Sequence, residues 1–224
     1  MVDRRKFLSY IPVLATVPLG SLVGSAQVAQ GAEERAALSP IENLMRAHGV
    51  LARAMLIYDD VRRRIAEGGS VDPALVIKVT SIIHDYFADY HEKMEEKYIF
   101  GPLEKADKEL VSIQELKVQH GVGWELTERI RNLARANKLT PEAIGYLQVY
   151  TMMFRHHAAW EDTVVFPAFH SLVTAKELAE LGQTFEKEEQ RQFGPDGFKS
   201  VVAVLSDVEK HLGIYDLSSS TPKL

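Results

Sequence analysis

Four long segments of the chain have apolar residues at alternating steps of three and four positions. This spacing places the side chains on one face of an α-helix, and no stretch alternates between apolar and polar residues as strands do. Residues that start or stop helices separate the segments: Ser39-Pro40, Gly68-Gly69, Asp72-Pro73, Gly101-Pro102, Ser112 to Glu115, Thr140-Pro141 and Pro167. Short connections favour antiparallel neighbours. The sequence therefore predicts an all-α fold, an up-down-up-down antiparallel four-helix bundle.

Two extra C-terminal helices are expected after the bundle. Thr174 and Glu177 form a capping box for the first of them, and the second is expected from about Gly197 to Leu212. The bundle itself is expected over residues 38–170, and the helical extension with its tail over 171–224.

The first 31 residues have the layout of an export signal. A basic start is followed by an apolar run from 10 to about 23 and then by small residues, as in secretory leaders. The stretch Arg4-Arg5-Lys6-Phe7-Leu8 is similar to the twin-arginine signal. We expect a signal peptide of the twin-arginine type over 1–31, recognition by the twin-arginine export machinery, and a periplasmic or otherwise exported protein. The alternative is an uncleaved N-terminal anchor.

Composition excludes several classes of function. The chain has no cysteine, so it cannot form disulfides, zinc fingers, iron–sulfur clusters or a thiol nucleophile. Its formal net charge is −5, whereas nucleic-acid-binding proteins usually present a basic face. No nucleic acid is expected as a partner.

Four of the eight histidines interrupt the apolar stripes, one in each predicted helix, and two of them have a glutamate one turn later. These residues are His48, His91, Glu95, His120, His157 and Glu161. A His and a Glu four positions apart lie on the same helix face. We counted the residues between each histidine and its predicted helix end. At about 1.5 Å per residue, this count places each histidine roughly 12–14 Å from the same end of the bundle. All six side chains are therefore expected in one layer.

The two HxxxE motifs have matching flanks, with the shared pattern H-x-x-x-E-[ED]-x-x-[IV]-F before a proline. One such motif alone is usually a surface pair, and one histidine on an apolar stripe is usually a core residue. Together, buried imidazoles and carboxylates are costly unless they are neutralised. Divalent metals neutralise them, and histidine with carboxylate suits iron, manganese or zinc. The pattern predicts a dinuclear metal site.

These motifs, from His48 to Phe169, resemble the hemerythrin-like (HHE cation-binding) domain. The resemblance implies a non-haem centre of two iron ions with an oxo or hydroxo bridge, manganese or zinc being the less favoured metals. It also implies that the four histidines are terminal ligands, and that Glu95 and Glu161 bridge the metals. Asp162 is an alternative to Glu161, because some hemerythrins have HxxxxD at this point.

One departure concerns the third helix, where oxygen-carrying hemerythrins have a further histidine one turn away. Here the corresponding positions are Leu116 and Trp124, which leaves about two coordination positions open rather than one. His84 is a candidate replacement ligand, with a core or supporting role as the alternative. His156, His170 and His211 are not expected to bind metal.

Three functions follow from this interpretation. The first is a di-iron protein that binds or senses O₂, NO or a related small ligand. The second is an enzyme that uses the same centre to consume peroxide, O₂ or NO. The third is a zinc or manganese bundle without redox chemistry.

Overall fold

The computed structural model describes residues 38–222, which contain helices and short connections and no strand. The predicted all-α class is therefore confirmed for this part of the chain. No helix within it is both long and apolar enough to cross a membrane. The predicted signal peptide lies outside the described residues.

The first helix, α1 (Pro40–Ala66), begins as the sequence predicts. Ser39 Oγ accepts a hydrogen bond from the Glu42 amide at 3.2 Å, and Glu42 Oε2 accepts one from the Ser39 amide at 2.9 Å. This reciprocal pair satisfies two amide groups that the first turn of a helix leaves free. The helix stops before Gly68, whose φ of +77° is readily adopted only by glycine.

The second helical rod is continuous but irregular. It consists of α2 (Pro73–Ile82), the π-helical η2 (Ile83–His91), α3 (Glu92–Glu95), the π-helical η3 (Glu96–Phe100) and α4 (Gly101–Lys105). The predicted end at Gly101-Pro102 is wrong, because the rod continues to Lys105. The Gly101 amide bonds to the Glu96 carbonyl in a π turn, so Pro102 falls in the first turn of α4. Proline is tolerated there because its missing N–H would be unpaired in any residue.

The third helix, α5 (Leu110–Arg135), starts before the predicted Ser112 capping box. Asp107 and Glu109 adopt left-handed φ angles of 52° and 51°, which turn the chain earlier than expected. The Ser112 hydroxyl instead lies 3.4 Å from Glu109 Oε2. The predicted start of this helix is therefore wrong by one short turn.

The fourth rod consists of α6 (Pro141–Trp160), the π-helical η4 (Glu161–Val165) and α7 (Phe166–His170). Pro167 does not end it as predicted. The Phe166 amide bonds to the Glu161 carbonyl, so this proline also falls in the first turn of a new α-segment. Both HxxxE motifs are thus followed at once by a π turn and a proline.

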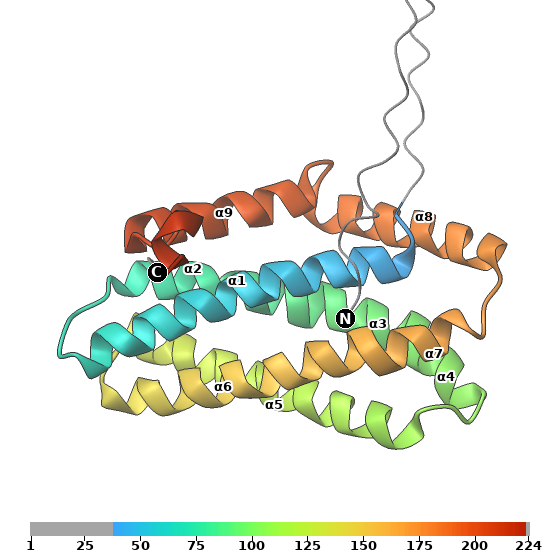
Figure 1. The fold of residues 1–224 in the computed structure, drawn as a ribbon, viewed down its shortest axis with the longest axis horizontal. Helices are drawn as coiled ribbons and strands as arrows, with labels where there is room; N and C mark the ends of the chain where they lie inside the picture. The colour runs from blue at the N-terminus through green and yellow to red at the C-terminus, as the bar shows by residue number, and fades with distance from the viewer. Residues whose placement is uncertain (1–37, 223–224) are drawn as a thin grey trace, which may run out of the picture. The chain divides into compact units, whose positions relative to one another are not determined.

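The four rods enclose one core, in which α1 packs against α6 and α5 packs against both α2 and α6 (Figure 1). The core is rich in fully buried aromatic rings, and Tyr58 and Tyr150 meet edge to face at 5.5 Å. Burying each large side chain contributes about 1.5–3 kcal/mol. This packing holds the histidine-bearing faces of the rods against one another.

The last two long helices, α8 (Ala175–Phe193) and α9 (Gly197–Leu212), pack on α1, and α9 also contacts α2 (Figure 1). A short 3₁₀ turn, η5 (Leu217–Ser220), follows. Arg53 of α1 donates to Glu209 at 2.8 Å. A side chain at Gly182 would collide with the backbone of Leu38, so glycine permits this close approach. These helices cover one side of the bundle.

Candidate metal centre

Six side chains that the sequence predicts as ligands are buried inside the bundle. The relative exposures are 6% for His48, 3% for His91, 0% for Glu95, 4% for His120, 3% for His157 and 0% for Glu161. They come from α1, from the second rod, from α5 and from the fourth rod. Such deep burial of ionisable groups is rare in proteins unless the groups are paired.

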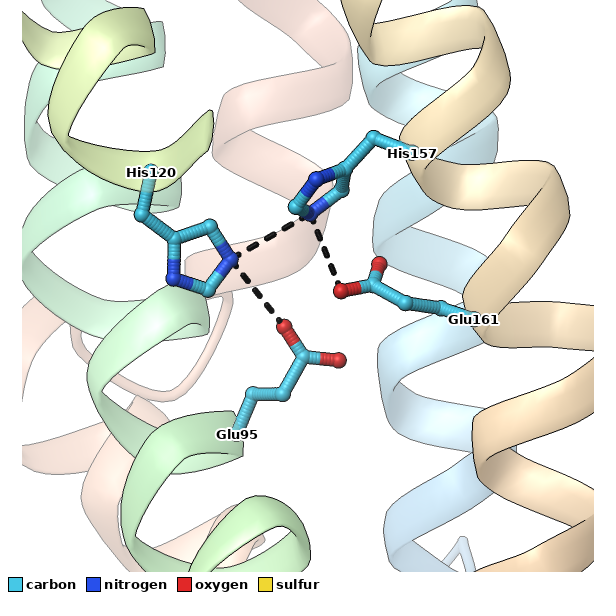
Figure 2. Close-up of side chains that lie close together, drawn as sticks. All are labelled: Glu95, His120, His157 and Glu161. Carbon is cyan, nitrogen blue, oxygen red and sulfur yellow. Dashed lines mark hydrogen bonds and ion pairs between the residues drawn. The ribbon is translucent and has the colours of Figure 1, made fainter. Parts of the chain in front are cut away.

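The compact part of the centre comprises Glu95, His120, His157 and Glu161 (Figure 2). Each offers one ligand atom, and these four atoms all lie within 4.8 Å of one another. The Nε2 atoms of His120 and His157 face each other at 3.2 Å. His120 Nε2 is also 3.6 Å from Glu95 Oε2, and His157 Nε2 is 2.9 Å from Glu161 Oε1. Two imidazole nitrogens and two carboxylates therefore converge on one small volume.

His48 joins this cluster through Glu161. Its Nε2 atom lies 3.2 Å from Glu161 Oε2, whereas His157 faces the other oxygen of the same carboxylate. The His91 ring lies 5.1 Å from the His48 ring, and its buried Nδ1 has no hydrogen-bond partner within residues 38–222. The structure thus brings all six residues together, and their role as ligands stays a prediction.

Three side chains that the sequence analysis did not assign this role hold the outer nitrogens of the histidines. Asp162 Oδ1 lies 2.8 Å from His48 Nδ1, and Glu96 Oε1 lies 2.8 Å from His120 Nδ1. Each is the second acid of an HxxxE[ED] motif, so the signal was in the sequence. Gln119 Oε1 lies 3.0 Å from His157 Nδ1. Such contacts orient a ligand imidazole and fix which nitrogen is protonated.

The two acids of each HxxxE[ED] motif contact a histidine that lies in the other half of the bundle. Glu95 and Glu96 of the second rod face the two nitrogens of His120, and Glu161 and Asp162 of the fourth rod face those of His48. The alternative in which Asp162 bridges metals is disfavoured, because its carboxylate lies on the outer nitrogen of His48.

The same spacing between each motif and its phenylalanine places an aromatic ring behind each of these two histidines. Phe166 stacks on His48 with ring centroids 5.7 Å apart, and Phe100 stacks on His120 at 5.8 Å. Both pairs are nearly parallel, with interplanar angles of 12° and 11°. The rings restrict the imidazoles to one plane.

The charges of the centre fit a cation. None of the oxygens of Glu95 and Glu161 makes a hydrogen bond of good geometry within residues 38–222. Leaving a charged group buried and unpaired costs several kcal/mol. Burial and the charge of Glu161 raise the pKa of Glu95. Burial alone would raise the pKa of Glu161 as well, but the facing His157 and His48 outweigh it and lower that pKa.

The histidines divide into two kinds. Burial would lower the pKa of His48, but Asp162 and Glu161 raise it to about 10. Burial likewise opposes the charge on His120, and Glu95 and Glu96 raise its pKa to about 10. Burial and the nearby His48 lower the pKa of His91. In the metal-free protein, the protons on His48 and His120 therefore provide the positive charge that a bound cation would otherwise provide.

The remaining histidines lie away from this cluster. His84 is partly exposed and its Nδ1 lies 2.8 Å from Asp85, outside the group of six. His156, His170 and His211 are exposed. On the third helix, Leu116 is buried and Trp124 is 48% exposed.

Comparison with known proteins gives consistent matches. The hemerythrin HHE cation binding domain matches residues 39–169. Uncharacterised proteins from Mycobacterium tuberculosis and Mycobacterium bovis are each 41% identical over 196 residues, covering 85% of this chain and 76% of theirs. No solved structure matches the chain.

Proposed function

Because the chain belongs to the hemerythrin HHE cation-binding family, we propose that it holds two iron ions and binds or senses O₂, NO or a related small ligand. Membership of this family implies cation binding. The observation that supports the proposal most directly is the pair of fully buried carboxylates, Glu95 and Glu161, without good hydrogen bonds among the described residues. Two such carboxylates are stable in their ionised form only with positive charge between them.

The proposed ligands are the six buried residues. His48, His91, His120 and His157 would bind the metals as terminal ligands, and Glu95 and Glu161 would bridge them. Imidazole and carboxylate ligands without sulfur suit iron. Two iron ions held by these residues would supply redox chemistry and would bind a small ligand. Glu96, Asp162 and Gln119 would keep three imidazoles oriented by accepting from Nδ1.

The proposal includes the arrangement of the chain. The bundle would occupy residues 38–170 with up-down-up-down antiparallel rods, and 171–224 would be an extension that covers one side. Short connections between consecutive rods and the contacts of α1 with α6 and of α2 with α5 support this topology. The twin-arginine-type sequence at residues 4–8 supports a signal peptide over 1–31 and export to the periplasm.

Metal content and optical absorption test the proposal. We expect about two iron ions per chain in purified full-length protein, and in air an absorption band typical of a bridged diferric pair. One ion per chain, or zinc without such a band, would contradict it. Steady-state consumption of peroxide or NO faster than with free iron would instead favour the enzyme.

A further inference from the structure

Glu92 is a buried carboxylate that the six-residue cluster does not include. It is 7% exposed, and no hydrogen bond or ion pair to it occurs within the described residues. Burying an ionisable side chain without a partner is costly. A cation close to this carboxylate would provide the partner that it lacks.

Glu92 lines a cavity of about 510 Å³ between the second rod and α5. His120 of the predicted centre forms part of the same wall. Gly121 contributes no side chain, and nothing lies within 4 Å of where its Cβ would be. The cavity thus leads from the surface to the edge of the metal centre.

Acidic side chains line this cavity at increasing depth. The side chain of Asp89 is 58% exposed and that of Glu96 is 31% exposed, whereas Glu92 as a residue is 7% exposed. Asp89, Glu92 and Glu96 all belong to the second rod and line the same cavity. Glu125 adds a further carboxylate from α5. Lys93 and Lys117 also line the wall, and Lys117 is paired with Glu104 at 2.6 Å. Because these carboxylates are spread along the wall, they suit the passage of a cation through the cavity rather than its retention at one point.

A second cavity reaches the centre from the other side of α5 and differs in chemistry. Its volume is about 290 Å³, and it touches His157. Its wall contains Val111, Leu116 and Trp160, and Glu115 is its one acid. In the repeated motif, the residue that corresponds to Glu92 is Ala158. The negative charge is therefore concentrated in the cavity lined by Glu92 and not in the cavity that touches His157.

We propose that divalent cations reach the centre through the cavity lined by Asp89, Glu92, Glu96 and Glu125, with Glu92 as the last carboxylate that an incoming cation meets. This inference rests on the proposed function, because it assumes that the centre binds cations. The four acids outnumber the two lysines of this wall, and a cleft in which one sign of charge predominates raises the association rate of an oppositely charged ligand by tenfold or more.

Cobalt uptake by metal-free, full-length protein tests the route, with the rise in Co²⁺ absorbance followed by stopped flow. We expect Glu92→Gln to slow uptake about tenfold while the final cobalt content stays equal to wild type. Glu115→Gln, in the second cavity, is the matched control and should fill at the wild-type rate. Glu125→Gln should slow uptake about threefold, and added NaCl should slow wild type more than Glu92→Gln.

The outcomes separate the two proposals. If wild type fills and Glu92→Gln fills equally fast, the route is wrong and the proposed function stands. If Glu92→Gln holds less cobalt at saturation, Glu92 is a ligand of the centre and the route is again wrong. If wild type binds no cobalt at all, the proposed function and the route both fail. Should Glu92→Gln unfold, the Glu125→Gln rate decides.

Discussion

Asp162 Oδ1 lies 2.8 Å from Nδ1 of His48, although 114 positions separate the two residues in the chain. The contact leaves the other ring nitrogen, Nε2, facing Glu161 at 3.2 Å. A carboxylate on the outer nitrogen of a ligand histidine fixes the ring orientation and increases the basicity of the inner nitrogen.

Replacing Asp162 by Ala should weaken metal binding about 10- to 100-fold, because the His48 ring loses the group that orients it. Isothermal titration with Mn²⁺ or Co²⁺ measures the affinity. Asp85→Ala is the control, since Asp85 contacts His84 at the same 2.8 Å but outside the cluster. Equal affinities for the two variants would contradict the orienting role.

Gln119→Ala should lower the affinity of the site that contains His157, because the ring loses its 3.0 Å contact at Nδ1. Gln119→Glu should restore it, since a carboxylate also accepts from Nδ1–H. The measurement is again the metal affinity, with thermal unfolding of the metal-free variants as a check on the fold. A Glu variant no better than Ala would show that Gln119 only fills space.

Gly123 and Gly121 of α5 offer a paired test of packing around His157. A Cβ at Gly123 would lie 2.5 Å from the ring of Phe154, which is buried against His157, whereas a Cβ at Gly121 meets nothing within 4 Å. We expect Gly123→Ala to destabilise the protein by about 1–3 kcal/mol. Gly121→Ala should be neutral or stabilising by about 0.5–1 kcal/mol. Chemical unfolding of both variants gives the comparison, and equal stabilities would be inconsistent with the described packing.

Glu95→Gln should stabilise the metal-free protein while lowering its metal content. The pKa of Glu95 is raised in the folded state from an ordinary value of 4.5, so the folded chain retains this proton longer than the unfolded chain. The contribution of Glu95 to stability is therefore largest below pH 4.5 and is lost as pH rises through the raised pKa. Above that pH the variant should exceed wild type by about 1–3 kcal/mol. Because the pKa of Glu95 is raised to about 8, urea unfolding at pH 5 and pH 9 tests this, and a variant less stable at pH 9 would refute it.

Metal binding should release protons and should strengthen as pH rises. The pKa values of His48 and His120 are both raised to about 10 in the metal-free chain, so both rings are protonated at pH 7. A metal binds only neutral imidazole and ionised carboxylate, so the two histidine protons, and that of Glu95 where it is still bound, must leave as the centre fills. Titration calorimetry in buffers of different ionisation enthalpy counts them. An affinity independent of pH between 6 and 8 would contradict the described charge state.

The convergence of the six residues was predictable because it depends mainly on helical periodicity, which is a local property of the sequence. The starts of α1 and α8 were predictable for the same reason, since Ser39 with Glu42 and Thr174 with Glu177 form complete capping boxes.

The rod ends were not predictable from the prolines. Pro102 and Pro167 read as helix stops, but each follows a π turn and begins a new α-segment. A π turn has no simple sequence signature, because its extra residue is accommodated by packing around the site. The roles of Glu96 and Asp162 depend on contacts between distant parts of the chain, which periodicity within one helix does not reveal.

The crossed contacts between motifs have a consequence for how the centre forms. The acids of the first half hold the histidine of the second half, and those of the second half hold the histidine of the first. Neither half orients its own lone histidine, so the centre is complete only once both halves of the bundle have packed together.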